Sequence, residues 1–355
     1  MKHAPAKSWT PEELNALIRS YQGAAILAAA AELDIFSLLA GKPLTARVLA
    51  KRMIYDLRGL TVLLNALAAL RLLEKDAGRF SLSPGVAEVL TAGGTRNNLG
   101  MARHQATCMR RWGQLASVVK SGRPARWIVS VGGRAGDQEA FIAAMDNTSA
   151  PVADAVVQRV QPLKFRELLD IGGASGTWTI AFLQACPSAT AILFDLPSVI
   201  PLADRRLQAA GLGDRVQLAP GDFTIDPLPS GADLAWVSAI VHQNSRAENR
   251  ELFAKVFAAL RPGGRIAIRD FLMADGRTAP LAGTLFAVNM LVGTKGGGTF
   301  TLGELRADLE SAGFRNAAVL HRDEGMSSII VARKKARSRA RSRAATVRKK
   351  ATGRR

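Results

Sequence analysis

The fold of this chain follows from nine residues, Leu168-Leu169-Asp170-Ile171-Gly172-Gly173-Ala174-Ser175-Gly176. A short strand of buried type, residues 167–171, runs into a glycine-rich turn, and a helix is predicted to begin near Thr177. Glycine permits positive φ and lets a ligand approach the backbone. The N–H groups of the first helical turn then point toward that ligand. The pattern predicts a binding site where this strand ends.

Further strands follow this one at regular intervals. They are expected at residues 191–194, 216–218, 234–237 and 265–269, with helical patterns between them. Strands that alternate with helices predict a parallel sheet with right-handed crossovers. Residues 317–321 and 327–331 instead predict an antiparallel hairpin at a sheet edge. The fold class is therefore α/β, with a Rossmann-like, mostly parallel sheet.

The glycine turn and the next strand together indicate the kind of ligand. Asp195 ends that strand, 23 residues after Gly172, where doubly wound folds place a carboxylate for ribose hydroxyls. A dinucleotide fingerprint would need Gly at position 174 and Gly or Ala at 177, but Ala174 and Thr177 stand there. Asp170 would repel a phosphate and suits a cationic ligand such as S-adenosylmethionine. A glycine turn without any ligand is the alternative.

A third element follows the third strand, at Gly221-Asp222-Phe223. The carboxylate of Asp222 can accept a hydrogen bond from an adenine amino group, and Phe223 can stack on the ring. Gly-Asp is also a common turn, so this motif alone does not indicate a binding site. It does so only in combination with the glycine loop and Asp195. Together, the three elements predict an adenosine site.

The first hundred residues have a helical pattern. Thr10-Pro11 begins a helix, another short helix is expected from Pro43 to Ala50, and leucines recur at helical spacing from Leu60 to Leu70. Residues 74–79 are expected to form a turn, followed by a short strand at 79–82. Three helices and a small hairpin are typical of a winged helix, a module that binds DNA or forms dimers. The Leu60 helix, in the recognition position, has no basic residue between Leu60 and Leu70, which favours dimerisation.

Charge and cysteine content exclude several classes of protein. The net charge is +19, but residues 333–355 hold 12 Lys and Arg and no acid, which leaves +7 for residues 1–332. We expect this tail to be disordered; its charge allows non-specific contact with nucleic acid, which is not expected to be the function. Two cysteines cannot form a disulfide framework, and no apolar run approaches the roughly 20 residues of a membrane span. We therefore expect a cytoplasmic protein without a signal peptide or membrane partner.

The chain resembles a known family of enzymes. Residues 12–332 are similar to class I S-adenosylmethionine-dependent methyltransferases, and to the O-methyltransferase family of plant caffeic acid and bacterial hydroxyindole and polyketide enzymes. The resemblance is carried by residues 31–36, 63–67, 169–173, 194–197, 221–223 and 261–264, and by His242. It implies a winged-helix-like, helical dimerisation domain at 1–100, a connector at 101–160 that contributes to the acceptor pocket, and a methyltransferase domain at 161–332. A homodimer acting on a small molecule is expected.

The resemblance also implies roles for individual residues. The loop of Gly172, Gly173 and Gly176 would hold the methionyl part of the cofactor, and Ser238 stands at a further cofactor contact. His242 stands at the position of the general base, and Asp270 at that of an acid that orients it. Phe141, Met145 and Met290 are candidates for the acceptor pocket. On the residues alone, a structural role for His242, a capping role for Asp270 and a helical core around Phe141 and Met145 are the alternatives. No metal site is expected.

The chain departs from the family pattern near the predicted base. The family has acid-Trp-x-acid-Glu after the histidine, where this chain has Gln-Asn-Ser-Arg-Ala at 243–247. The second acid that supports the histidine is replaced by Thr299. The predicted function is transfer of a methyl group to a hydroxyl of a small aromatic molecule. The departures leave two alternatives, an N- or C-methyltransferase or a relative with changed chemistry. A DNA-associated winged-helix regulator is the alternative from another class.

Overall fold

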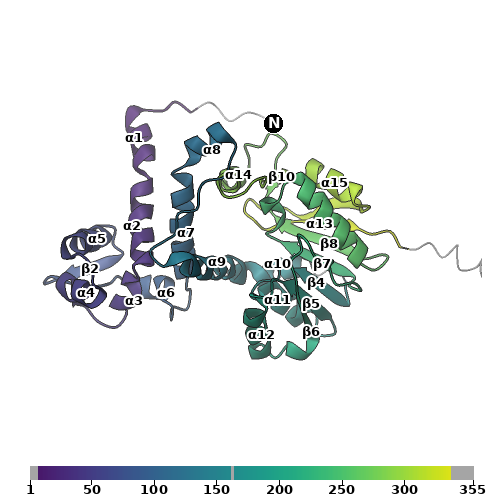
Figure 1. Cartoon of the computed structure of the whole chain (residues 1–355), viewed down its shortest axis with the longest axis horizontal. Helices are drawn as coiled ribbons and strands as arrows, with labels where there is room; N and C mark the ends of the chain where they lie inside the picture. The colour runs from purple at the N-terminus through teal and green to yellow at the C-terminus, as the bar shows by residue number, and fades with distance from the viewer. Residues whose placement is uncertain (1–6, 161–163, 337–355) are drawn as a thin grey trace, which may run out of the picture. The chain divides into compact units, whose positions relative to one another are not determined.

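A computed structural model describes residues 7–160 and 164–336 of the chain. The chain folds as two compact units (Figure 1). The helical unit comprises Met1–Ala116 and Arg126–Thr148, and the sheet unit comprises Ser117–Ala125 and Ser149–Arg355. None of the described helices is both long and apolar enough to cross a membrane.

The helical unit begins with the predicted helices and a small sheet. The helices are α1 (Pro11–Arg19), α2 (Tyr21–Glu32), α3 (Ile35–Leu39), α4 (Ala46–Met53), α5 (Leu57–Ala69), α6 (Val86–Leu90), α7 (Leu99–Trp112) and α9 (Gly133–Ser149). The sheet has the order β1-β3-β2, from β1 (Leu44–Thr45), β2 (Leu73–Asp76) and β3 (Arg79–Leu82). Helix α8 (Leu115–Ser121) has residues in both units.

The periodic leucines of α5 form part of the core of the helical unit. Leu60, Leu64 and Leu67 are buried beside Phe36 and Phe80, whereas Leu70 at the end of the pattern is 44% exposed. Two local predictions were wrong. Leu44 and Thr45 pair with β3, so α4 begins at Ala46, later than predicted. Residues 74–76 belong to β2, which also pairs with β3, so the turn is shorter than expected.

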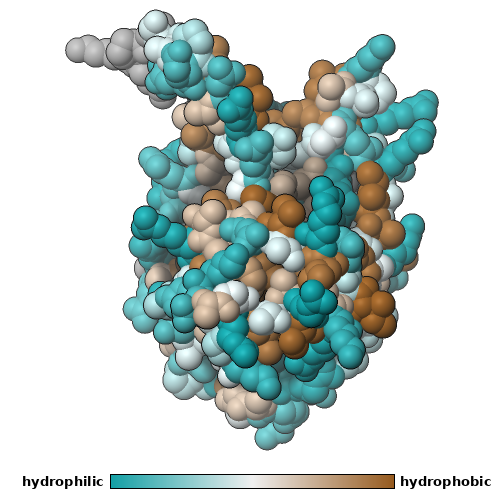
Figure 2. Space-filling view, turned by 90° about the vertical axis from the view of Figure 1, so that its left-hand side faces the viewer, coloured by the Kyte–Doolittle hydropathy of each residue, from teal (hydrophilic) through white to brown (hydrophobic). Residues whose placement is uncertain are grey.

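Helix α1 is amphipathic but buries nothing within the described chain. Thr10 and Glu13 form a capping box at its start, with the Thr10 side chain accepting a hydrogen bond from the backbone N–H of Glu13. Its apolar face is exposed, including Leu17 at 57% and Ile18 at 68%. Figure 2 shows apolar residues exposed at one face of the molecule. An exposed apolar helix face at this spacing is typical of a surface that packs against another chain.

The sheet unit is built on seven strands in the order β11-β12-β8-β7-β4-β5-β6. Five are parallel: β4 (Glu167–Ile171), β5 (Thr190–Asp195), β6 (Val216–Pro220), β7 (Leu234–Ser238) and β8 (Arg265–Asp270). The predicted hairpin, β11 (Arg315–His321) and β12 (Ser328–Arg333), is antiparallel and puts β11 at an edge. The chain runs outward from β4 to β6 and then returns to β7 on the other side of β4. Ligands of such sheets bind where this reversal occurs, at the carboxyl ends of the strands.

Helices cover both faces of this sheet (Figure 1). The core of one face includes residues of α10 (Ala153–Val160), α11 (Thr177–Ala185) and α12 (Ile200–Ala209). The core of the other face includes residues of α13 (Arg246–Ala259) and α15 (Leu302–Ser311). Helix α14 (Leu281–Gly293) connects two short strands that the sequence did not predict, β9 (Leu272–Met273) and β10 (Phe300–Thr301). These two strands pair with each other in parallel.

The end of the described chain is fastened to the sheet unit. The backbone N–H of Lys334, just past β12, donates to the carbonyl of Gly264 at 2.8 Å. Its ammonium donates to carbonyls of the last turn of α13, among them those of Phe257 and Leu260. It also lies 4.7 Å from the centre of the Phe257 ring. A lysine at a helix C-terminus is stabilised by the helix dipole. Most of the tail predicted to be disordered, residues 337–355, lies outside the described residues.

Candidate active site

The glycine loop joins β4 to α11, and α11 begins at Thr177 as predicted. Gly172 and Gly176 have φ values of +67° and +80°, and the N–H of Gly172 donates to the carbonyl of Phe194 at 2.8 Å. A Cβ at Gly172 would lie 2.7 Å from Cδ1 of Ile240, and one at Gly173 would lie 2.6 Å from Cγ of Leu193. The loop is therefore packed too closely for side chains at these two positions.

Asp170 lies at the base of this loop. Its Oδ2 accepts a hydrogen bond from the Thr179 hydroxyl at 2.7 Å, and the residue is 1% exposed. Burial, together with the smaller effect of the negative charge of Asp195, raises the pKa of the Asp170 carboxyl to about 7. The carboxyl is therefore poised between its two protonation states near neutral pH. A positively charged group bound nearby would favour the ionised form.

Asp195, at the end of β5, is bonded to the glycine loop. Its Oδ2 accepts from the N–H of Ala174 at 2.7 Å, and its Oδ1 accepts from the N–H of Leu196 at 2.6 Å. Partial burial raises the pKa of this carboxyl. An ionised carboxylate has about four acceptor sites, so one N–H on each oxygen leaves each able to accept again. This geometry suits two adjacent hydroxyl groups.

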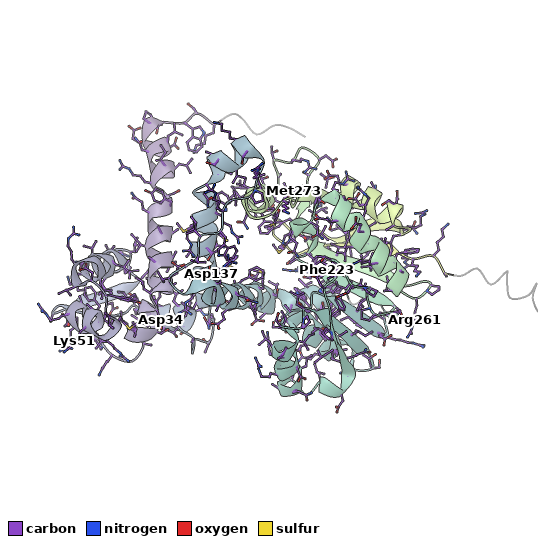
Figure 3. All side chains as sticks on the ribbon, in the orientation of Figure 1. Asp34, Lys51, Asp137, Phe223, Arg261 and Met273 are labelled. Carbon is purple, nitrogen blue, oxygen red and sulfur yellow. The ribbon has the colours of Figure 1, made fainter. Side chains whose placement is uncertain are left out.

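The Asp222–Phe223 pair lies beside Asp195, because the N–H of Gly221 donates to the Asp195 carbonyl at 2.9 Å. Both the N–H and the hydroxyl of Thr224 donate to Oδ1 of Asp222 and lower the pKa of this carboxyl. The ring of half-buried Phe223, labelled in Figure 3, comes within 3.9 Å of the position that a Gly172 Cβ would occupy. The three elements quoted from the sequence thus meet at one edge of the sheet.

Ser238 ends β7 on the other side of β4. Ile171 and Val237 are register partners, so Ser238 lies next to Gly172. The residue after it, Ala239, has φ of +57°. A residue other than glycine in this region costs about 1–3 kcal/mol and is common at functional sites. No feature of the sequence could have identified Ala239.

His242 and Asp270 meet at the ends of β7 and β8. The His242 Nδ1 lies 2.9 Å from Oδ1 and 3.0 Å from Oδ2 of Asp270. The same carboxylate accepts from the backbone N–H of His242 at 3.2 Å and of Phe271 at 2.8 Å. With its proton on Nδ1, the imidazole donates to this carboxylate alongside the two backbone N–H groups. The Nε2 of His242 is then a proton acceptor.

One phenylalanine packs against the imidazole, and a second phenylalanine packs against the first. The ring of Phe286, on α14, meets the His242 ring edge to face, with 4.8 Å between centroids and 86° between planes. Phe271 in turn lies 4.8 Å from Phe286. His242 itself is only 8% exposed. The contact with Phe286 restricts the rotation of the imidazole.

The residues that depart from the family pattern have structural partners. The buried Thr299 hydroxyl donates to the Gly283 carbonyl at 3.3 Å, so it fastens α14, and within the described residues it forms no hydrogen bond with the imidazole. Ser245 and Glu248 form a capping box at the start of α13. Arg246 forms a two-pronged ion pair with Asp308 of α15, at 2.9 Å for both contacts. In this chain, 243–247 fixes the helix that follows the histidine.

The three predicted acceptor residues lie in different units. Phe141 and Met145 belong to α9 of the helical unit, and Met290 is buried in α14 of the sheet unit. Phe141 is 48% exposed, and its ring meets that of His104 on α7 at 5.3 Å. The pocket assignment of these three residues stays a prediction.

A sheet of this order, with a glycine loop after β4 and acidic residues after β5 and β6, defines a class I S-adenosylmethionine-dependent methyltransferase. Residues 112–315 match the O-methyltransferase domain family, and residues 16–92 match the O-methyltransferase dimerisation domain. The chain therefore belongs to the O-methyltransferase family, and its cofactor is S-adenosylmethionine. The site fits this cofactor, because the loop has no room for side chains and the acids suit a cation and a ribose.

Similar proteins support this assignment. The chain is 31% identical to the tetracenomycin polyketide synthesis 8-O-methyl transferase TcmO of Streptomyces glaucescens, over 91% of this chain and 97% of that protein. It is 30% identical to the N,N-dimethyltransferase OxyT of Streptomyces rimosus, over 84% of this chain and 89% of that protein. The solved structure of human N-acetylserotonin methyltransferase in complex with S-adenosylmethionine superposes with a TM-score of 0.77, at 25% identity, over 94% of this chain and 100% of that one.

Proposed function

We propose that this O-methyltransferase methylates a hydroxyl of a small aromatic molecule, with His242 as the general base. The observation that carries the proposal is the His242–Asp270 pair, whose Nδ1–carboxylate distance of 2.9 Å leaves Nε2 as the proton acceptor. The pair follows β7 and β8, at the same sheet edge as the glycine loop. Incubation with S-adenosylmethionine and a panel of phenols tests the proposal, and no methylated product from any of them would count against it.

The chemistry requires little beyond alignment and one proton acceptor. S-adenosylmethionine supplies a methyl group on a sulfonium, which is already activated for displacement. His242 Nε2 takes the proton of the acceptor hydroxyl as its oxygen bonds to the methyl carbon, and the electron pair of the broken carbon–sulfur bond stays on sulfur. Asp270 then stabilises the imidazolium. General-base catalysis of this kind contributes about 10²–10⁴-fold. Phe286 packs edge to face against the imidazole and helps to hold its orientation.

We assign the cofactor contacts by the charge and position of each group. The methionyl part lies against Gly172, Gly173 and Gly176, with Asp170 beneath. The ribose hydroxyls donate to Asp195, and the adenine lies between Asp222 and Phe223. Ser238 faces the methionyl end from β7. What supports this order is the sequence of contacts along the sheet edge, from Ser238 through Gly172 to Asp195 and Gly221.

Cofactor affinity is expected to tighten as pH rises from about 6 to 8. Burial raises the pKa of free Asp170 to about 7, whereas a bound sulfonium and ammonium favour its ionised form. Binding below pH 7 must therefore release a proton, and the dissociation constant rises by up to about tenfold for each unit by which the pH falls. Calorimetric titration in buffers of different ionisation enthalpy measures this proton release. Asp170→Asn should remove the pH dependence, and an equal slope in both proteins would assign it to another group.

A hydroxyl acceptor is favoured, but one relative is an N,N-dimethyltransferase, and this chain lacks the second acid beside the base. An arylamine has a lone pair before it loses a proton, so it needs a base less than a phenol does. Matched phenol and aniline acceptors, assayed with wild type and His242→Ala, distinguish the two. Turnover of anilines that survives His242→Ala would establish the N-methyltransferase alternative.

The dimerisation domain indicates a homodimer, in which we propose that the exposed apolar face of α1 takes part. Ile18→Asp is expected to convert the dimer to a monomer. Ile18 is 68% exposed in the single chain, and a charge at this position would have to be buried in the proposed interface. Light scattering after size exclusion measures the mass. Ala16→Asp, on the same helix but on the side away from Leu14, Leu17 and Ile18, is the matched control. A dimer that survives Ile18→Asp would place the interface elsewhere.

Dimerisation also explains the winged helix better than DNA binding does. Helix α5, in the recognition position, carries Arg58 as its only basic residue. Both cysteines, Cys108 and Cys186, are free thiols, which agrees with the cytoplasmic location that we propose.

A further inference from the structure

Arg269, on β8, is a buried cation. It is 1% exposed, and burial lowers the pKa of its guanidinium to about 10. Its Nη1 donates to the Ser238 hydroxyl at 3.2 Å and its Nη2 to the Ser327 hydroxyl at 3.4 Å. Its Nε has no partner among the described residues. The guanidinium carbon lies 4.6 Å from the centre of the Trp178 ring.

The charge of Arg269 has no direct counter-ion in the described part of the chain, where no carboxylate oxygen lies within 4.0 Å of it. Asp270 and Asp323 act on it only from a distance. Asp270 is committed to His242 and to backbone N–H groups, and Asp323 to the backbone N–H groups of the loop after it. A buried charge without a partner is strongly unfavourable. An anion that binds close to Arg269 would therefore be stabilised by its charge.

Ser238 links this charge to the cofactor site. Because Nη1 of Arg269 donates to the Ser238 oxygen, the hydroxyl proton is left to be donated to a further acceptor. Ser238 is half-buried and lies next to Gly172, and Trp178 belongs to the first turn of the helix that the glycine loop begins. Arg269 therefore contacts both sides of the proposed methionyl site, through Ser238 on β7 and Trp178 on α11.

We propose that Arg269 is a positioning residue that acts through Ser238 on the methionyl carboxylate of S-adenosylmethionine. This carboxylate is the single anionic group of the cofactor. The other end of the site carries Asp195 and Asp222, which repel an anion, so charge as well as shape fixes the direction in which the cofactor binds. The inference rests on the proposed cofactor contacts and adds to them the group that recognises the carboxylate.

Decarboxylated S-adenosylmethionine provides the test, because it keeps the adenosine, the sulfonium and the amine and lacks only the carboxylate. Calorimetric titration of wild type and Arg269→Met with both ligands gives four affinities. Arg269→Met is expected to weaken S-adenosylmethionine binding by about 10- to 100-fold, the range for hydrogen bonds to charged groups. Binding of the decarboxylated ligand should change by less than about threefold.

Arg265→Met is the matched control. Arg265 lies on the same strand, about 13 Å away, and it also has a buried N–H group without a partner among the described residues. It lies at the opposite end of the strand from Ser238, so this variant should keep the wild-type preference for the carboxylate. Ser238→Ala, which retains the guanidinium, should lose most of that preference and carries the test if Arg269→Met does not fold.

Three outcomes would overturn the inference. Equal weakening of both ligands would make Arg269 structural, and unchanged binding of both would make it irrelevant to the cofactor. If Arg265→Met also loses the preference for the ligand with the carboxylate, that preference arises from the charge of the whole strand and not from Arg269. If the wild-type protein binds neither ligand, the proposed cofactor site itself is wrong. This result differs from the three above, which contradict only the role of Arg269.

Discussion

His242→Ala is expected to lower kcat with a phenolic acceptor by about 10²–10⁴-fold, the range for removal of a general base. The affinity for S-adenosylmethionine should stay within about threefold of wild type, because the imidazole bonds to Asp270 and not to a proposed cofactor contact. Steady-state kinetics for turnover and calorimetry for affinity measure the two effects separately. His321→Ala, on β11 of the same unit, is the matched control.

Asp270→Asn tests the geometry of the same pair. An amide can present its N–H₂ group to Nδ1 and thereby leave the imidazole proton on Nε2, where no base function remains. We therefore expect a loss of kcat comparable to that of His242→Ala. Normal turnover in both variants would show that the acceptor proton leaves without the pair. An acceptor that needs no base, such as an amine, would then be indicated.

Asp195→Ala is expected to weaken binding of S-adenosylmethionine and S-adenosylhomocysteine by about 10²–10⁴-fold. Two hydroxyl-to-carboxylate hydrogen bonds are lost, each worth about 1.5–3 kcal/mol. The substitution also removes the oxygen that accepts from the N–H of Ala174, so the glycine loop loses one of its anchors. Calorimetric titration with both ligands measures the effect.

The controls for Asp195 separate charge from shape. Asp204→Ala removes an exposed carboxylate from α12 and should leave the affinity unchanged. Asp195→Asn keeps one acceptor oxygen and should fall between wild type and alanine. If Asp195→Ala binds both ligands as tightly as the wild-type protein does, the ribose must be held by other groups and the assignment along the sheet edge is wrong.

The sequence predicted the parts of the sheet unit whose signals are local. All five parallel strands were expected, because each is a short apolar run bounded by turns. The glycine loop, Asp195 and the Asp222–Phe223 pair follow three of these strands, and parallel strands bring their carboxyl ends to one edge. Adjacency of the strands was therefore enough to predict that these residues would meet.

What the sequence did not predict depends on pairing between distant segments. The strands β9 and β10 have two residues each, too few for any periodicity, and they exist because each has the other as a partner. The Thr299 hydroxyl bonds to Gly283, 16 residues away, and the sequence indicates no such contact. Arg269 did leave a signal, since a charge inside a strand of buried type is unusual. Its partners on β7 and in the loop before β12 appear only in the fold.

The attachment of Lys334 has a consequence for the basic segment that follows it. The lysine bonds to carbonyls at the end of α13 and joins the end of β12 to Gly264, so the last strand is anchored by a residue that precedes this segment. Removal of residues 337–355 would therefore leave the contacts of Lys334 in place.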